Sequence, residues 1–317
     1  MLRNLIICCL TLAVLGIAVS QAQDSGKHGT DASKLWPPWS QSPSNGFNFT
    51  VQQIDNVPDL HGDIVDPQLV VFFAGNQFMA TAELMDAFRR EHPEVQRIYW
   101  ETLPPGILAK QIEQGAVIIG NLRIAITPDI YTAGGKRIRQ FEEQKRFDRV
   151  EQYAQNRLAI MVRKGNPKKV LSLNDLGRNN VRVSMPNPAW EGVATLITSS
   201  YKNAGGEQLV DRIMQEKVKD GTTFLTHIHH RQTPLRIMMG ESDAGVVWYT
   251  EAKFQKMIGN PINLVEIPAK QNVTGMYFAG LFKNAPHAQA AREFMDFLMS
   301  EKAQAIFRKY GFLPPAK

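Results

Sequence analysis

The clearest pattern in this chain is a series of short apolar runs, each followed by a segment with helical spacing. Residues 69–73 read Leu-Val-Val-Phe-Phe, a continuous run typical of a strand that is buried on both faces. Apolar residues then recur at helical spacing over 77–91, and Pro93 ends that helix. A second strand over 97–100 and a short helix over 107–114 follow. This alternation predicts an α/β sheet with right-handed crossovers.

The same pattern returns in the second half of the chain. The elements predicted there are strands over 158–162, 180–183 and 244–248, and a helix after Gly192 that runs to about Asn203. Residues 288–299 and 301–310 have the spacing of two amphipathic helices, with Ser300 as N-cap of the second and Gly311 just past its end. The chain is long enough for two lobes, each with its own core.

The first 66 residues differ in composition from the rest. Residues 1–22 have the features of a secretory signal, because Arg3 precedes an apolar stretch and small residues allow a cut after Ala22. The alternative is an uncleaved anchor, for which the apolar run is short. Residues 23–66 are rich in Ser, Gly, Pro, Asp and Asn, so we expect an extension there, with Trp36–Trp39 packing back onto the body and order beginning at Gln68.

Composition limits the chemistry that is available. Both cysteines, Cys8 and Cys9, lie in the signal, so the mature chain has no thiol for a disulfide, a nucleophile or a metal ligand. The net charge of +6 is compatible with anionic ligands, but no Lys/Arg block indicates nucleic-acid binding. The chain has no G-x-S-x-G, H-E-x-x-H or phosphate-loop motif. We therefore expect neither an enzyme nor a bound cofactor.

Several segments of this chain resemble the periplasmic molybdate-binding proteins. Residues 153–158 and 162–167 resemble their lobe-crossing strand, 108–115 a helix of their first lobe, 241–247 the short strand leading into their pocket, and 291–298, 303–306 and 309–315 their C-terminal helix pair. All of these segments occur in the same order, over about 250 residues.

The resemblance implies a type II solute-binding protein of an ABC importer, with two α/β lobes joined by two crossing strands. It places the first lobe at 67–154, the second at 155–267 and the return to the first at 268–317. We expect a periplasmic monomer whose partners are a small solute and an ABC permease in the inner membrane. The lobes are expected to close over the ligand at crossings near 153–156 and 267–270.

The resemblance also implies where the ligand lies. Four junctions, 75–77, 104–106, 190–192 and 230–234, are predicted to begin helices, whose free N–H groups favour anions. The family's contacts fall on Asn76, Pro105, Glu191, His230 and Trp248, with Arg231 and Tyr249 as neighbours. Pro105 has no donor, so Thr102 or Thr127 is expected to substitute for it. The expected ligand is a small oxyanion such as molybdate or tungstate.

Glu191 conflicts with that expectation. A carboxylate in the cleft weakens anion binding unless it is protonated, paired with a metal or turned away. A protonated His230 ring would also offset its charge. The alternative is an ordinary acid at a helix start, where the helix dipole favours it.

A histidine cluster supports a second hypothesis. His227, His229 and His230 stand within four residues, and together with Glu191 they would suit zinc or a similar metal ion. If this stretch is a strand, His227 and His229 share one face and His230 lies on the other. A metal cation or chelate is therefore the alternative ligand, and a binding protein that works without a transporter is a further possibility.

Overall fold

The computed structural model describes residues 47–50, 58–119, 122–189, 191–227 and 229–316. All of these belong to one compact unit of the chain, residues 32–317. The predicted signal, both cysteines and Trp36–Trp39 lie outside the described residues. Among the described helices, none combines the length and the apolar composition that crossing a membrane requires.

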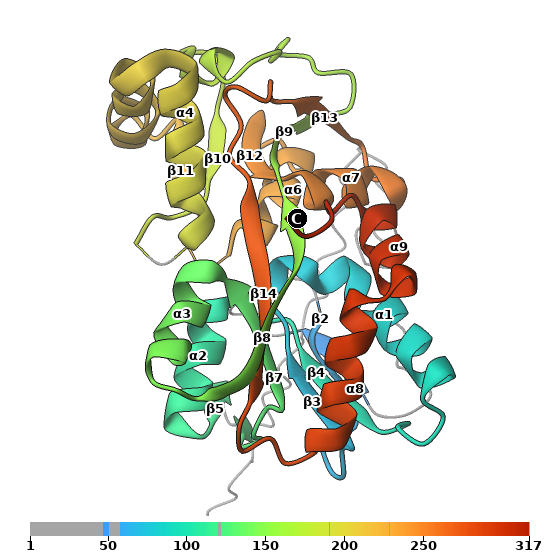
Figure 1. Ribbon diagram of the computed structural model, residues 1–317. Helices are drawn as coiled ribbons and strands as arrows, with labels where there is room; N and C mark the ends of the chain where they lie inside the picture. Colours follow the sequence, from blue (N-terminus) through green and yellow to red (C-terminus); the bar gives the residue numbers. More distant parts are fainter. Residues whose placement is uncertain (1–46, 51–57, 120–121, 190, 228, 317) are drawn as a thin grey trace, which may run out of the picture. The chain divides into compact units, whose positions relative to one another are not determined.

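One half of the described chain is built on a seven-stranded sheet (Figure 1). Its order is β1 (Phe47–Thr50), β2 (Pro58–Gly62), β4 (Ile98–Glu101), β3 (Leu69–Phe72), β7 (Ile130–Gly134), β14 (Gly275–Phe282) and β8 (Phe147–Asn156). Strand β3 is parallel to β4 and β7, whereas β14 is antiparallel to β7 and β8. The central strands are therefore parallel, as the strand–helix alternation predicted.

Helices cover both faces of this sheet. The side chains of Leu69 and Val71 pack in a core with α1 (Phe78–Glu91), α8 (Ala288–Met299) and α9 (Glu301–Tyr310). The alternate side chains, Val70 and Phe72, pack in a second core with α2 (Pro105–Gln114) and α3 (Gly135–Glu143). Burial on both faces explains why this strand is a continuous apolar run.

The other half is built on a five-stranded sheet. Its order is β11 (Thr223–Leu225), β10 (Val183–Met185), β12 (Ala244–Trp248), β9 (Leu158–Arg163) and β13 (Ile262–Glu266). One face packs against α4 (Gly192–Asp211), and the other against α6 (Thr233–Met238) and α7 (Tyr249–Met257). The smaller elements are a β5 (Val117–Ile119) and β6 (Leu122–Ile124) hairpin, the 3-10 turns Gly75–Gln77, Asn174–Gly177 and His230–Gln232, a π turn over Arg212–Glu216, and α5 (Lys217–Lys219).

The chain passes between the two sheets twice. Strand β8 ends at Asn156 and β9 begins at Leu158, so the first crossing is at Arg157; the second is the segment 267–274 between β13 and β14. The side chain of Asn272 accepts a hydrogen bond from the Leu158 N–H at 2.9 Å and donates one to the Leu158 carbonyl at 2.9 Å. The two connections are therefore tied to each other by a side-chain amide.

Most elements expected from apolar spacing are confirmed. The C-terminal helices have the expected bounds; the Ser300 side chain caps the second, and Gly311 follows it with φ 98°. All four junctions expected to begin helices do so. Helix α4 continues beyond Asn203 to Asp211, although Gly205 and Gly206 interrupt its helical backbone.

The expectation that order begins at Gln68 is wrong. Strands β1 and β2 precede that residue, and β2 pairs antiparallel with β4. The buried side chains that β2 contributes include Asp59 and His61, which are polar. The His61 ring stacks on Trp100 with centroids 5.0 Å apart. Polar residues at buried positions removed the apolar pattern that reveals a strand.

The strand expected over 180–183 is displaced to β10, Val183–Met185. A turn precedes it, in which the Val181 N–H bonds to the Arg178 carbonyl at 3.3 Å. The Lys217 amino group donates to the carbonyls of the same two residues at 2.5 and 2.7 Å, which holds the turn in place.

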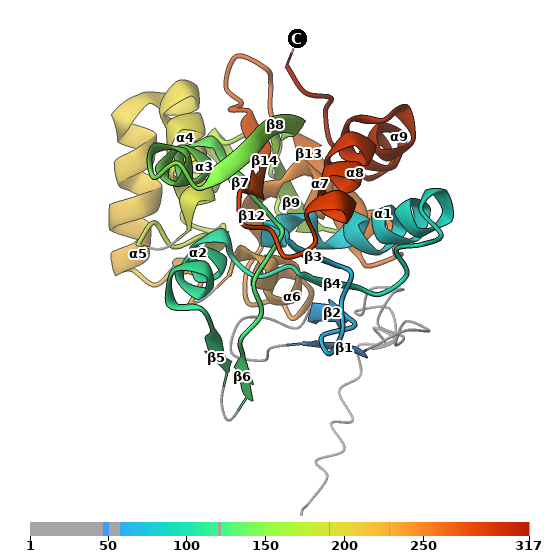
Figure 2. The same cartoon turned by 60° about the horizontal axis from the view of Figure 1, so that its bottom comes forward.

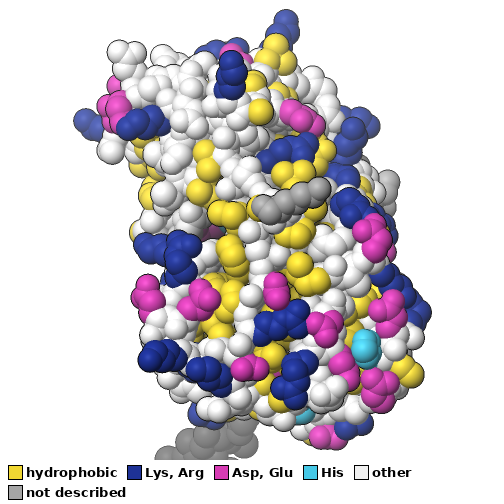
Figure 3. Space-filling model, viewed as in Figure 1, with side chains coloured by type: hydrophobic (Ala, Val, Ile, Leu, Met, Phe, Trp, Pro, Cys, Tyr) yellow, Lys and Arg dark blue, Asp and Glu magenta, His cyan; other side chains and the backbone are white. Residues whose placement is uncertain are grey.

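Charged side chains of both signs are interspersed on the face shown in Figure 3. Hydrophobic side chains gather along its middle, where Figure 1 shows β14 and β8. Met276 of β14 is 47% exposed. This face therefore carries both signs of charge around an apolar centre.

Candidate functional site

The centre of the candidate site is the imidazole of His230, which lies between two carboxylates. His230 starts the 3-10 turn that follows β11, Glu191 precedes α4, and Glu251 lies in the first turn of α7. The His230 Nδ1 atom is 2.6 Å from Glu191 Oε2, and its Nε2 atom is 3.1 Å from Glu251 Oε1. All three residues are at most 8% exposed. Three segments of the five-stranded half thus meet at one buried ion-pair network.

The Glu191 carboxylate receives four hydrogen bonds. Its Oε1 atom accepts from the Asn187 N–H at 3.1 Å and from the Thr226 hydroxyl. Its Oε2 atom accepts from the His230 N–H at 2.7 Å and from the His230 ring at 2.6 Å. The donors come from the loop before α4, the residue after β11 and the 3-10 turn. These segments together surround the negative charge of Glu191 with hydrogen-bond donors.

The network fixes the charge of its members. Burial alone lowers the pKa of His230, but the Glu251 charge and the hydrogen bond to Glu191 outweigh burial and raise that pKa to about 10. Burial raises the pKa of Glu191, yet the hydrogen bond and charge of His230 lower it below its usual value overall. At neutral pH, His230 is therefore an imidazolium ion and Glu191 a carboxylate.

His229 has the opposite state. Burial lowers its pKa well below the usual value, and the charges of His230 and Arg231 lower it further. Its ring stacks on that of His230 with centroids 4.2 Å apart. Its Nδ1 atom accepts the Arg231 N–H at 3.0 Å, which caps the 3-10 turn. His229 is thus neutral and positions its two neighbours.

Arg231 connects this network to the seven-stranded half. Its guanidinium lies 2.5 Å from the Asp59 carboxylate on β2 and donates to the Gly75 carbonyl at 3.2 Å. It also lies over the Phe78 ring, 5.4 Å from the centroid. A Cβ atom at position 75 would lie 2.7 Å from the Thr102 carbonyl oxygen, so only glycine fits where these two backbone segments approach each other.

A second connection passes through Tyr277 on β14. Its hydroxyl accepts hydrogen bonds from Asn76, and from Asn156 at 3.3 Å. Asn156 also donates to the Thr250 hydroxyl on α7 at 2.9 Å. The Trp248 ring is tilted against Tyr277 with centroids 5.9 Å apart. Elements of both halves therefore meet at this tyrosine.

The structure brings together most residues named from the sequence. Glu191 and His230 are in direct contact, and Arg231 follows them. The Trp248 N–H donates to Glu251 at 3.3 Å. The Thr102 N–H donates to the Asp59 carbonyl at 2.8 Å, so Thr102 lies beside the partner of Arg231.

Two of the named residues have other contacts. The Pro105 carbonyl accepts from Tyr131 at 2.8 Å, in the core with α2. The Tyr249 ring lies under the Arg157 guanidinium, 3.8 Å from its centre, at the first crossing. These partners, Tyr131 and Arg157, lie outside the network around His230.

The proposed metal ligands are only partly brought together. Glu191, His229 and His230 offer ligand atoms within 4.8 Å of one another, and all three are buried. His227 is exposed and packs edge-on against Phe224. The expectation of a strand through these histidines is wrong, because β11 ends at Leu225 and His230 begins a 3-10 turn.

Sequence reasoning missed five residues at these connections. They are Asp59, Asn156, Thr226, Glu251 and Tyr277. Glu251 had only half of a capping-box signal, because the acid stands three residues after the N-cap but that N-cap is Trp248, whose side chain accepts no hydrogen bond. The others lie on strands or directly after one, and their partners are 35 or more residues away in the chain.

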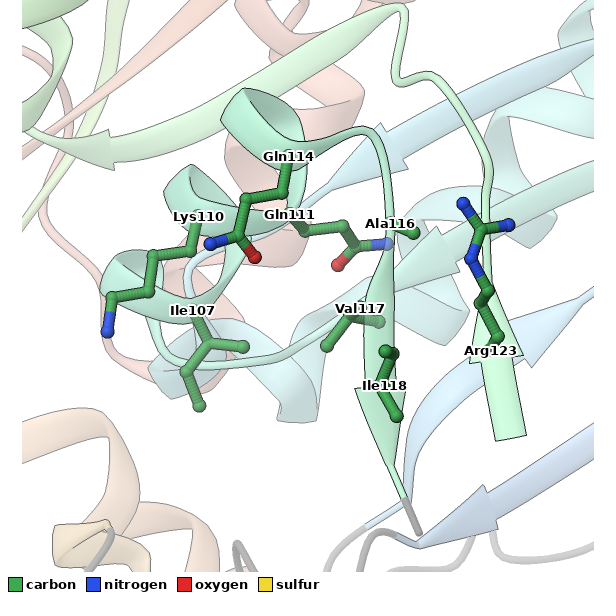
Figure 4. A pocket seen from close by; sticks show the side chains of 8 residues that line it. All are labelled: Ile107, Lys110, Gln111, Gln114, Ala116, Val117, Ile118 and Arg123. Carbon is green, nitrogen blue, oxygen red and sulfur yellow. The ribbon is translucent and has the colours of Figure 1, made fainter. Parts of the chain in front are cut away.

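A separate cavity of about 430 Å³ lies between α2 and the hairpin of β5 and β6. Figure 2 shows this hairpin extending away from α2. The lining, drawn in Figure 4, is Ile107, Lys110, Gln111, Gln114, Ala116, Val117, Ile118 and Arg123. None of the ligand residues expected from the sequence lines this cavity.

Comparison with known proteins identifies related chains. YvgL of Bacillus subtilis (strain 168), which carries the name of an ABC transporter substrate-binding lipoprotein, is 26% identical over 247 residues, covering 77% of this chain and 85% of YvgL. The molybdate-binding protein ModA of Mycobacterium tuberculosis H37Rv is 22% identical over 258 residues, covering 78% of this chain and 85% of ModA. These relatives are named as binding proteins and not as enzymes.

Solved structures share the fold. The periplasmic molybdate-binding protein of Azotobacter vinelandii has a TM-score of 0.63 at 18% identity, covering 78% of this chain and all of that one. The sulfate-binding protein SubI of Mycobacterium tuberculosis has a TM-score of 0.63 at 18% identity, covering 78% and 86%. The two-lobed type II binding-protein fold is therefore confirmed. Because residues 69–313 match the model of the bacterial extracellular solute-binding proteins, the chain belongs to that family.

Proposed function

We propose that this chain is the extracytoplasmic receptor of an ABC importer and that it captures a small oxyanion, of the molybdate or tungstate kind, at the network around Glu191 and His230. The observation that carries this proposal is the convergence of four hydrogen-bond donors on the Glu191 carboxylate. Oriented N–H and O–H groups in a buried place are what an oxyanion needs. Relatives named for molybdate and sulfate support the ligand class.

The position of the network supports capture by hinge closure. A ligand drives closure only if it binds the closed state better, so it must touch both lobes. Arg231 contacts the seven-stranded half through Asp59, and Asn76 bonds to Tyr277, whose ring packs against Trp248 of the five-stranded half. An oxyanion at this place would contact the donors of the five-stranded half and the start of α1 together. The closed form would then be recognised by the membrane permease.

Thermal unfolding with a panel of anions tests the proposal. The untagged chain without residues 1–22 is heated with molybdate, tungstate, sulfate, phosphate or chloride at equal ionic strength. At least one oxyanion is expected to stabilise the protein, by about 2.7 kcal/mol at a hundred times its Kd. Stabilisation by another ligand class, with none from any oxyanion, would refute the anion proposal.

The buried group of Glu191, His229 and His230 supports a metal cation as the second candidate. Imidazole and carboxylate ligands suit zinc and similar ions. However, His230 has a pKa of about 10, so a cation must first displace a tightly held proton. Elemental analysis of untagged protein separates the two candidates. One equivalent of metal that survives dialysis would favour the cation.

A further inference from the structure

We propose that the Glu191 carboxylate is a built-in substitute for the ligand's anionic group, which the ligand must displace in order to bind. This inference rests on the proposed function. The group that the donors recognise is a pair of oxygen atoms on one central atom. A carboxylate has such a pair, and so does one edge of a tetrahedral oxyanion.

The donors are divided equally between the two oxygens. Oε1 takes one backbone N–H and one hydroxyl, from Asn187 and Thr226. Oε2 takes one backbone N–H and one ring nitrogen, both from His230. Two donors to each of two oxygen atoms can bind any group in which two oxygens share one central atom, as paired donors bind a carboxylate.

The side chain of Glu191 does not serve its own helix. Glu191 occupies the N-cap position of α4, yet its carboxylate makes no capping hydrogen bond there. Ser300, at the same position of α9, accepts a hydrogen bond from the Ala303 N–H in the usual way. The Glu191 carboxylate is instead turned to donors that come from three other segments. The Glu191 carboxylate therefore serves these four donors and not the start of α4.

The neighbouring charge allows the exchange. When the Glu191 carboxylate leaves, the His230 ring keeps its contact with Glu251, whose Oε1 atom lies 3.1 Å from the ring Nε2 atom. The arriving anion then meets the same four donors. Because the competitor is part of the chain, the apparent affinity is reduced by the fraction of molecules in which Glu191 occupies the pocket.

Calorimetric titration of variants with molybdate, sulfate and formate tests this inference. Glu191→Ala removes the substitute and is expected to bind the preferred anion at least ten times more tightly than the natural chain. Glu191→Gln keeps the volume but turns an amide NH₂ towards two donors, so it should show an intermediate gain. It also provides the measurement if the alanine variant does not fold.

Asp129 offers a matched control. Its buried carboxylate also accepts backbone N–H groups, from Val70 and His287, and a His287 ring nitrogen at 2.9 Å. Asp129→Ala and Asp129→Asn should leave anion affinity at the natural level. An equal gain in these variants would mean that anions merely fill a vacated carboxylate site, which would overturn the inference.

The outcomes separate the inference from the proposed function. If the natural chain binds an oxyanion and Glu191→Ala binds it equally or more weakly, the receptor proposal stands and the substitute role is refuted. If no anion binds to the natural chain or to either Glu191 variant, both proposals fail.

Discussion

The guanidinium of Arg231 and the carboxylate of Asp59 lie 2.5 Å apart, with side chains 1% and 0% exposed. Arg231 belongs to the 3-10 turn that follows β11 of the five-stranded sheet, and Asp59 belongs to β2 of the seven-stranded sheet. Breaking one partner of a buried pair leaves the other charge without compensation. This ion pair therefore links the two halves of the protein.

Asp59→Asn should lower the free energy of unfolding by about 3–5 kcal/mol, because it removes the negative charge of this buried pair. Urea denaturation measures the change. The exposed pair of Lys202 and Glu207 is the control, and Glu207→Gln should leave the free energy of unfolding nearly unchanged. Equal effects of the two substitutions would show that the buried pair contributes no more than a surface pair.

The ring of His230 should remain protonated well above neutral pH. Its pKa is raised from 6.5 to about 10, so its contribution to stability is complete below pH 6.5 and is lost as the pH rises through 10. NMR titration of the imidazole follows the proton directly. His230→Gln should remove this part of the fall in stability between pH 7 and 10. A ring that titrates near 6.5 would contradict the ion-pair network.

Glu101 should make the protein less stable as the pH rises from about 4.5 to about 7. Burial raises its pKa to about 7 despite hydrogen bonds from Gln111 and Tyr99, so the folded chain holds this proton more tightly than the unfolded chain does. Glu101→Gln should gain up to about 3 kcal/mol over the natural chain at pH 8 and nothing at pH 4. Identical pH profiles of the two proteins would exclude a neutral carboxyl group at this position.

Tyr277→Phe should destabilise the protein by about 1–3 kcal/mol, because the Asn76 and Asn156 amides lose a shared buried acceptor. It should also weaken anion binding, since Asn76 begins the first-lobe side of the site. Tyr249→Phe keeps the ring that packs on Arg157 and is the control for both measurements. The prediction fails if the two variants unfold at the same urea concentration.

The sequence was sufficient for elements that bury apolar side chains with regular spacing. The run from Leu69 and the helices over 288–310 are examples, since their packing against neighbouring elements is what produces the period. Strand β2 was missed for the opposite reason, because Asp59 and His61 fill buried positions with polar groups. Residue propensity and apolar spacing do not reveal a strand that is stabilised by contacts between polar side chains.

The candidate site was only partly foreseeable. The family resemblance brought Glu191 and His230 to the same region, and the possibility that a protonated ring offsets the carboxylate followed from their charges. The four donors on Glu191 could not be foreseen, because Thr226 and the His230 N–H lie 35 and 39 residues away from it. Only the tertiary structure aligns such distant groups on two oxygen atoms.

Calorimetric titration of the untagged chain without residues 1–22 with molybdate, sulfate and zinc is the most direct test of oxyanion capture. We expect saturable binding of one oxyanion per chain and no stoichiometric zinc. One equivalent of bound zinc, with no heat from any oxyanion, would contradict this function.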